Sequence, residues 1–168
     1  IDSQNNGLFL SHPDGGKWNG IFVANHISGA QIGDHISLDG EIFEQFGFTT
    51  LRFPKNLQVI SKRNQLPQPV LVTTRELSVS ECYEGVLVQL SNVTVVGESG
   101  RKGVYLIDDG SGACRLSDSF ISLNPYKPDF NLNDTFSSII GVVDYRYGEY
   151  RINPRDTNDI KKTYVGVS

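Results

Sequence analysis

Hydrophobic and polar residues alternate between His35 and Glu44. One side of this segment carries Ile36, Leu38, Gly40 and Ile42, and the other carries Ser37, Asp39 and Glu41. A period of two places alternate side chains on opposite faces of a sheet, so this pattern predicts a half-buried β-strand. The next residues, Gln45 to Gly47, are a turn, and Phe48 to Phe53 form the returning strand of a hairpin.

Short apolar runs bounded by turn residues predict further strands along the chain. Before the linker they are Gly7–Leu10, Trp18–Ala24 and Asn56–Ile60, and after it they are Val86–Val96, Val104–Ile107, Cys114–Leu116, Phe136–Tyr145 and Tyr150–Asn153. In the first strand after the linker, the apolar phase slips near Leu90-Ser91, as a β-bulge would cause. One helical turn, capped by Thr73 or Thr74 and reaching Leu77, is the longest helix that we expect near the linker.

The last third of the chain repeats the first third at an offset of roughly 100 residues. Matching segments include Gly7–Leu10 with Gly103–Leu106, Ile32–Ile36 with Leu132–Phe136, Phe46–Phe48 with Tyr147–Tyr150, and Leu57–Ile60 with Thr157–Ile160. A period this long indicates a duplicated domain, because solenoid units span about 20–50 residues. The second copy has a strand, Val86 to Val96, that has no counterpart at the front of the first copy.

Five short strands in a module, the first long and bent, predict a small Greek-key barrel of the OB type. The sequence therefore predicts an all-β chain with two tandem OB-like five-stranded Greek-key barrels, the first lacking its first strand. We expect a first module over 1–65, a Pro-containing linker over 66–73, a second module over 74–162, and a tail strand or linker over 163–168. The predicted cores include Trp18, Ile21, Phe22, Ile36 and Leu38 in the first module, and Val86, Val88, Leu106, Ile140 and Val142 in the second.

The net charge of −4 and the pI near 5.3 give no strong attraction to a phosphate backbone. No apolar run approaches the roughly 20 residues of a membrane-spanning helix, so no membrane span is expected. The two cysteines, Cys82 and Cys114, have no zinc-binding spacing. They are predicted to form a disulfide, because Cys82 enters the first strand of the second module and Cys114 begins its third, and these strands can approach each other in a small closed barrel. Two free buried thiols are the alternative.

Two N-glycosylation sequons begin at Asn92 and Asn133, and they carry glycans only if the source is a eukaryote. Together with the expected disulfide they favour an extracellular location. Because Val93 and Val95 are expected to face the barrel interior, Asn92 should face outward.

The residue types that carry catalysis or bind metals do not converge in the sequence. Asp108 and Asp109, with Asp118 nearby, are interpreted as turn residues, with calcium binding as the alternative. The three histidines, His12, His26 and His35, are interpreted as surface or turn residues. We therefore expect no catalytic residue, no metal site and no cofactor.

Aromatic and basic residues gather in the last hairpin of the second module, and Phe43, Phe46 and Phe48 gather in the first. OB barrels bind oligonucleotides or oligosaccharides on aromatic platforms. The candidate ligand-binding residues are Tyr145, Arg146, Tyr147, Tyr150 and Arg151. A polysaccharide or a single-stranded nucleic acid is the corresponding ligand, and the alternative is that these rings cover the barrel end or the boundary between the modules.

The missing strand of the first module leaves two strand edges open, and exposed edges recruit other chains. Residues upstream of Ile1 would complete the barrel within the chain. The alternative is the segment Thr163–Ser168 of a neighbouring subunit, which would complete it by β-augmentation and build a filament. As a third possibility the sheet stays open.

Eight stretches of the chain together carry a resemblance to a known family: Gly7–Leu10, Pro13–Gly16, Trp18–Val23, Tyr83–Val88, Asn92–Val95, Asp108–Gly112, Phe136–Val143 and Tyr150–Arg155. Through them, nearly the whole chain resembles the tandem OB-fold region of secreted bacterial nucleases, which carry a separate endonuclease/exonuclease/phosphatase domain. It implies a non-catalytic binding or spacer region of a larger extracellular protein, accessory to a nuclease domain, with other domains of the parent protein as partners. The alternative is a structural subunit of an extracellular assembly built by strand exchange.

Overall fold

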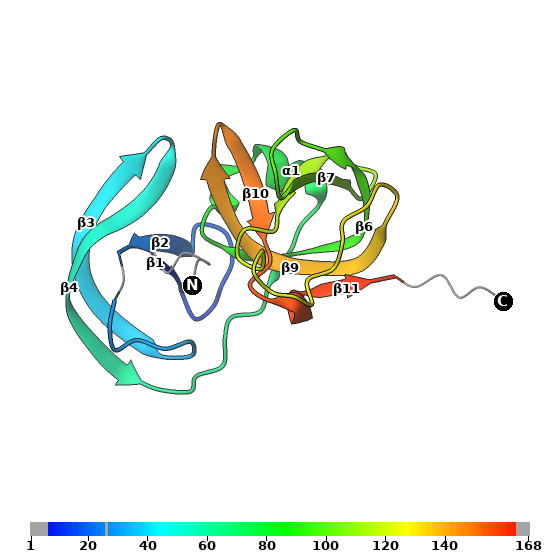
Figure 1. Cartoon of the computed structure of the whole chain (residues 1–168). Helices are drawn as coiled ribbons and strands as arrows, with labels where there is room; N and C mark the ends of the chain where they lie inside the picture. Colours follow the sequence, from blue (N-terminus) through cyan, green and yellow to red (C-terminus); the bar gives the residue numbers. More distant parts are fainter. Residues whose placement is uncertain (1–6, 26, 164–168) are drawn as a thin grey trace.

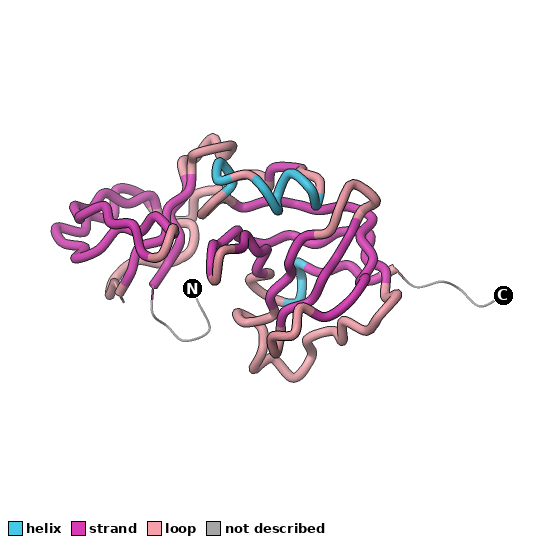
Figure 2. The backbone as a smooth tube through the Cα atoms, turned by 90° about the horizontal axis from the view of Figure 1, so that it is seen from above, coloured by secondary structure: helices cyan, strands magenta, loops and turns pink. Residues whose placement is uncertain are grey.

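The computed structural model describes residues 7–25 and 27–163, and its strands gather into two groups joined by an extended segment (Figures 1 and 2). The first group contains β1 (Gly7–Ser11), β2 (Gly20–Ala24), β3 (His35–Gln45) and β4 (Phe48–Ser61). The second contains β5 (Val70–Leu71), α1 (Thr74–Val79), the 3₁₀ turn η1 (Glu81–Tyr83), β6 (Leu87–Glu98), β7 (Val104–Asp108), β8 (Cys114–Ser117), β9 (Thr135–Arg146), β10 (Glu149–Asn153), the 3₁₀ turn η2 (Thr157–Asp159) and β11 (Ile160–Lys162). The mostly-β expectation is confirmed.

Five strands of the second group close into a barrel in the order β6-β7-β8-β10-β9. The pairing of β6 with β9, from Leu87–Val142 to Thr94–Thr135, joins the two ends of the sheet. All neighbours in the barrel are antiparallel except β8 and β10, which run parallel. Two short strands extend this sheet, β5 beside β6 and β11 beside β9.

The barrel interior is filled by aliphatic side chains from all five strands. On β6 the buried positions are Val88, Leu90, Val93 and Val95. The alternation changes phase at Asn92, whose φ of +54° rotates the strand between Ser91 and Val93. This phase change confirms the slip expected near Leu90-Ser91, and it keeps both halves of a long bent strand facing one core.

The helix α1 begins where the sequence predicts, with Thr73 as its N-cap and a capping box to Glu76. Asp109, in the turn between β7 and β8, accepts hydrogen bonds from the backbone N of Thr74 at 3.0 Å and from its Oγ1 at 2.7 Å. These bonds and those from Ser111 hold the pKa of Asp109 at about 2, below its ordinary value, although burial acts in the opposite direction. The Asp-rich turn is thus explained by structural hydrogen bonds.

The first group forms an open sheet in the order β1-β2-β4-β3. Its β2 and β4 run parallel, and its other neighbours run antiparallel. This order and these directions match β7-β8-β10-β9 of the barrel, strand for strand. The first sheet therefore has the barrel's connectivity, and no counterpart of β6 occurs in the part of the chain that the structure describes.

Aromatic rings line the face of the first sheet that packs toward the barrel. Phe22 lies between Phe9 and Phe48, with ring centroids 5.0 and 5.7 Å apart, and Phe9 reaches Phe120 of the second group at 6.1 Å. The predicted core position Phe22 thus faces this junction.

Trp18, predicted for the core or its rim, is 69% exposed, because its backbone N donates to the Cys82 carbonyl at 2.8 Å and a φ of +64° turns its ring to solvent.

Backbone meets backbone where the two groups touch. A Cβ added to Gly20 would lie 2.2 Å from the carbonyl oxygen of Gly85, and Gly85 itself has a φ of +72°. Only glycine fits at such a close approach. The relative position of the two groups is therefore determined by main-chain contacts as well as by side chains.

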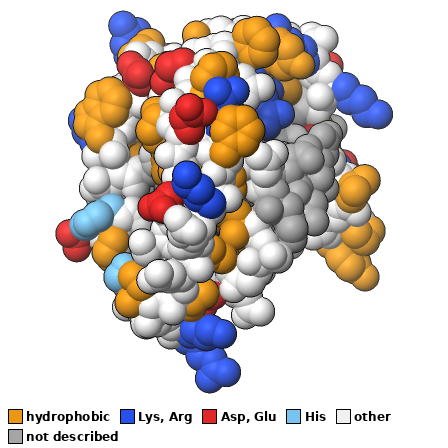
Figure 3. All heavy atoms as spheres, turned by 90° about the vertical axis from the view of Figure 1, so that its left-hand side faces the viewer, with side chains coloured by type: hydrophobic (Ala, Val, Ile, Leu, Met, Phe, Trp, Pro, Cys, Tyr) orange, Lys and Arg blue, Asp and Glu red, His pale blue; other side chains and the backbone are white. Residues whose placement is uncertain are grey.

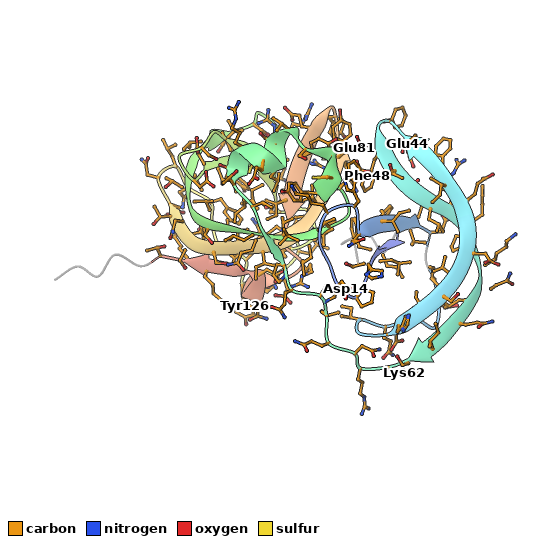
Figure 4. The ribbon with its side chains drawn as sticks, turned by 180° about the vertical axis from the view of Figure 1, so that it is seen from behind. Asp14, Glu44, Phe48, Lys62, Glu81 and Tyr126 are labelled. Carbon is orange, nitrogen blue, oxygen red and sulfur yellow. The ribbon has the colours of Figure 1, made fainter. Side chains whose placement is uncertain are left out.

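A buried carboxyl also spans this junction. Glu84 is 9% exposed, its Oε1 accepts a hydrogen bond from the backbone N of Thr49 at 2.8 Å, and its Oε2 has no partner among the described residues. Burial raises the pKa of Glu84 to about 7, and the nearby carboxylates of Glu44 and Glu81, both labelled in Figure 4, act in the same direction. The folded protein therefore holds this proton more tightly than the unfolded chain does.

We predict that Glu84→Gln removes a pH-dependent component of stability. The contribution of the protonated carboxyl is fully present below the ordinary pKa of 4.5 and is lost as the pH rises through about 7. The free energy of unfolding should therefore fall by up to about 3 kcal/mol between pH 4.5 and pH 8 in the parent chain, and by much less in the variant. Urea denaturation across this range measures the difference.

The exposed Glu98 offers a matched control, because Glu98→Gln makes the same chemical change away from the junction. That variant should retain the parent pH dependence. Equal pH dependence in Glu84→Gln and the parent chain would contradict this account of Glu84.

Candidate functional site

The open sheet presents two unpaired strand edges, β1 at one end and β3 at the other. In the barrel the corresponding strands, β7 and β9, both pair with β6. Among residues 7–25 and 27–163, no strand therefore lies between β1 and β3, and we call this position the slot. Figure 1 shows β3 and β4 as a strongly curved pair that bends around β1 and β2.

Equivalent side chains in the two hairpins differ in exposure. Ile42 pairs with Leu51 on β3 and β4, and Val143 pairs with Ile152 on β9 and β10, at the same distance from their turns. Val143 and Ile152 are fully buried, whereas Ile42 is 62% exposed and Leu51 is half-buried. The main structural difference at these positions is the presence of β6 across the barrel, so the slot leaves the first core uncovered.

Glycine permits the curvature that both hairpins share. A Cβ on Gly40 would lie 2.1 Å from Cδ2 of Leu51, and a Cβ on Gly141 would lie 2.6 Å from the backbone oxygen of Asn153. The two glycines hold the same position relative to their turns. The first sheet is thus curved for closure, as the barrel is.

The register separates the two faces of the first sheet. Leu8, Val23 and Leu51 lie side by side on the face that lines the slot. The predicted core residues Ile36 and Leu38 of β3 are only half-buried. Figure 3 views the molecule from the side of this sheet and shows hydrophobic side chains interspersed with charged ones on its surface.

The chemistry that this arrangement offers is strand addition. The free edges of β1 and β3 present backbone N–H and C=O groups, and the apolar lining offers positions for alternate side chains of an added strand. Because β6 is antiparallel to both β7 and β9, a strand in the slot would run antiparallel to both edges.

A second feature is a pair of matched aromatic turns. Phe46 and Tyr147 have φ values of +53° and +57°, and each is followed by a glycine with a φ of +82°, as in type I′ turns. A bulky side chain rarely adopts a positive φ, because its Cβ meets the backbone there. Asn is the residue usually favoured at this position of a type I′ turn. Phe46 is 93% exposed and Tyr147 is 73% exposed, so neither ring is held in place by a core.

The two aromatic turns lie side by side at one end of the molecule (Figure 1). A Cβ on Gly47 would lie 2.8 Å from Cε1 of Tyr145, so the first turn packs directly on β9. Arginines lie against nearby rings, with the Cζ of Arg52 3.3 Å from the ring centroid of Phe43 and the Cζ of Arg101 4.3 Å from that of Tyr147. The sequence identified the aromatic clusters but gave no signal for Arg101, which comes from the β6–β7 loop.

The five predicted ligand-binding residues do not share one surface. Tyr145 and Tyr150 form a tilted ring pair 4.7 Å apart, and Tyr145 faces Gly47 of the first sheet. Arg151 is 5% exposed and makes two hydrogen bonds to Asp144, at 2.9 and 3.1 Å. Arg146 also pairs with Asp144, at 3.0 Å. Tyr147 is the predicted residue that projects furthest into solvent.

The predicted disulfide is wrong for this structure, because Cys82 and Cys114 are both free thiols. Cys82 lies in η1, before β6 begins, and its Sγ lies 2.9 Å from the Oγ of Ser80. Cys114 is buried at the start of β8, and burial raises the pKa of its thiol. The prediction placed Cys82 at the entry to the first strand of the second module, whereas the chain forms a 3₁₀ turn there and Cys82 is not paired with β8.

The remaining predicted sites are polar surface positions. Asn92 is exposed between the half-buried Ser91 and the buried Val93, and Asn133 is an exposed turn residue with a φ of +70°. His12 and His35 are exposed, whereas His26 lies outside the described residues. Over residues 7–25 and 27–163, no group of three His, Cys, Asp or Glu side chains is placed to hold a metal ion, and no helix is long and apolar enough to span a membrane.

Searches against protein-family models, curated proteins and solved structures found no match for this chain. The function proposed below therefore rests on the sequence and the structure of this chain.

We predict that the double variant Phe46→Asn/Tyr147→Asn is more stable than the parent chain. Asn adopts positive φ at lower cost than an aromatic residue, so the free energy of unfolding should rise by about 1–2 kcal/mol in total. Denaturant unfolding measures the change. Tyr126→Asn is the matched control, since Tyr126 is 85% exposed and is not among the positive-φ residues. If the double variant gains no more than this control, the two turns store no strain.

Proposed function

We propose that this chain is a non-catalytic module of two OB-like units, and that its first unit functions by accepting a β-strand into the slot. The shared connectivity supports this assignment. The two sheets share one strand order and one set of strand directions, including the parallel pair β2–β4 in one and β8–β10 in the other, and this sharing supports the assignment to a Greek-key barrel type.

The observation that carries the proposal is the contrast between Ile42, 62% exposed, and its barrel counterpart Val143, fully buried. Fully burying a side chain of this size contributes roughly 1.5–3 kcal/mol. The half-buried Ile36 and Leu38 would add to this gain. An added strand would also pair the edge groups of β1 and β3.

Within a larger protein, such a module acts as a spacer or assembly element. The resemblance to the tandem OB region of secreted nucleases supports an extracellular setting and a role accessory to a separate catalytic domain. The buried Cys114 thiol, with its raised pKa, is consistent with a structural role for that cysteine.

We predict that supplying the missing strand within the chain stabilises the first unit. The variant carries a copy of residues 86–103, which comprise β6 and its turn, in place of residues 1–6. Burial of the slot lining should raise the free energy of unfolding by about 3 kcal/mol and slow hydrogen exchange at the free edge of β3 by about 100-fold. Hydrogen exchange followed by NMR or mass spectrometry measures the effect.

The matched control carries the same graft with aspartate at the copied positions of Val88 and Leu90, which are fully buried in the barrel. This control should leave exchange at β3 as it is in the parent chain. Unchanged exchange at β3 in the intact graft as well would overturn the proposal.

A second candidate function is oligosaccharide binding at the paired aromatic turns, and the strained, exposed rings of Phe46 and Tyr147 favour it. Backbone strain tends to persist where function requires it, and aromatic faces stack on sugar rings. The acidic net charge of −4 disfavours a nucleic acid at the same surface.

We predict that a soluble β-glucan perturbs the NMR signals of these two turns, and that Phe46→Ala/Tyr147→Ala weakens this binding by at least tenfold. Tyr126→Ala is the control for loss of an exposed ring. Binding of oligothymidine in place of the glucan would redirect this function to single-stranded nucleic acid, and binding of neither probe would remove it.

A further inference from the structure

The slot has defined requirements for the strand that fills it, if the proposed function is correct. In the barrel, Val88 lies opposite Gly141 and Leu90 lies opposite Ile139. Counted from the hairpin turns, the matching positions on β3 are Gly40 and Leu38. A strand in the slot therefore needs apolar side chains two residues apart, directed at Gly40 and Leu38, and it needs to run antiparallel to β3.

The segment Thr163–Ser168 fits this pattern by sequence. Val165 and Val167 are two residues apart, both are β-branched, and no charged residue occurs in the segment. Residues 164–168 lie outside the described structure, and Thr163 directly follows β11. Each described strand already has a pairing partner, and this segment directly follows the last of them along the chain.

Charge favours the same placement and the same direction. With Val165 opposite Gly40, the antiparallel direction brings the residues that precede the segment toward the turn end of β3. Glu41 and Glu44 are exposed there, and the exposed Lys161 precedes the segment. In this register Lys161 would lie opposite Glu44, so that unlike charges meet there although the chain as a whole is acidic.

The end of β11 and the slot lie on different sides of the described structure. Figures 1 and 4 show β11 running along the barrel and away from the first sheet. Thr163 is fixed there, because its backbone N donates to the Thr135 carbonyl at 2.8 Å. The last described residue is therefore held on the side of the barrel away from the first sheet.

We propose that residues 163–168 of one copy fill the slot of a second copy, so that copies assemble head to tail. This inference rests on the proposed function, because it names the strand that the slot accepts. Donor and acceptor are different surfaces, so the contact is heterologous and each added copy presents a new slot. Assembly then produces open chains whose length grows with concentration.

The test measures the mass of the 168-residue chain by light scattering and sedimentation from low micromolar to near-millimolar concentration. The parent chain should grow beyond a dimer. Deletion of residues 164–168, which keeps the Thr163 hydrogen bond, should leave a monomer, and so should Val165→Asp/Val167→Asp. Tyr164→Asp, on the opposite face of the segment, is the matched control and should still assemble.

The chain with the β6 graft separates this inference from the proposal on which it rests. With its slot filled from within, that chain should be monomeric although its tail is intact. If the graft protects β3 but tail deletion leaves the assembly unchanged, the slot accepts a different strand and this inference is wrong. A parent chain that stays monomeric at all concentrations also overturns it, and an unprotected β3 in the graft overturns both proposals.

Discussion

The pairing of β6 with β9 is the interaction on which the barrel depends. It joins the first and last edges of a five-stranded sheet, so that no edge groups remain unpaired and the aliphatic lining loses contact with water. The first sheet has the same order, the same parallel pair and the same hairpin, but none of its described strands occupies the position of β6. Within its lining Val23 is fully buried, whereas Leu51 is half-buried and Ile42 is 62% exposed, and this exposure is the basis of the functional proposals.

The junction between the two groups stabilises the face of the first sheet that packs toward the barrel. The opposite face, which lines the slot, stays open. The aromatic stack of Phe9, Phe22 and Phe48 covers one face, and the contact between Gly20 and Gly85 fixes the approach. The other face can then be completed without disturbing the junction. The barrel thus holds the incomplete first sheet in place. That sheet already has the curvature with which an added strand could close it into a second barrel.

Much of the fold could be predicted from the sequence, because its signals are local. Alternation predicted β3, turn residues predicted both hairpins, and a capping threonine predicted α1. The absence of a first strand from the front of the repeat indicated the gap that the four-stranded sheet contains. These features depend on residues that are close together in the sequence.

Features that depend on long-range contacts were missed. The 3₁₀ turn that holds Cys82 apart from β6, the pairing of Arg151 with Asp144, and the burial of Glu84 against Thr49 each result from packing between distant segments. Residue types alone cannot distinguish a ligand-binding arginine from one that neutralises a buried carboxylate. Of the predicted ligand-binding residues, Tyr147 is exposed, whereas Arg151 is buried against Asp144.

The most direct test of the central claim is amide hydrogen exchange of the free edge of β3 in the assembled protein at high concentration. We expect the amides of β3 that face away from β4 to be protected as strongly as those that β9 directs toward β6. Fast exchange at these amides in the assembled state, while the barrel remains protected, would show that the slot stays empty and would contradict the account.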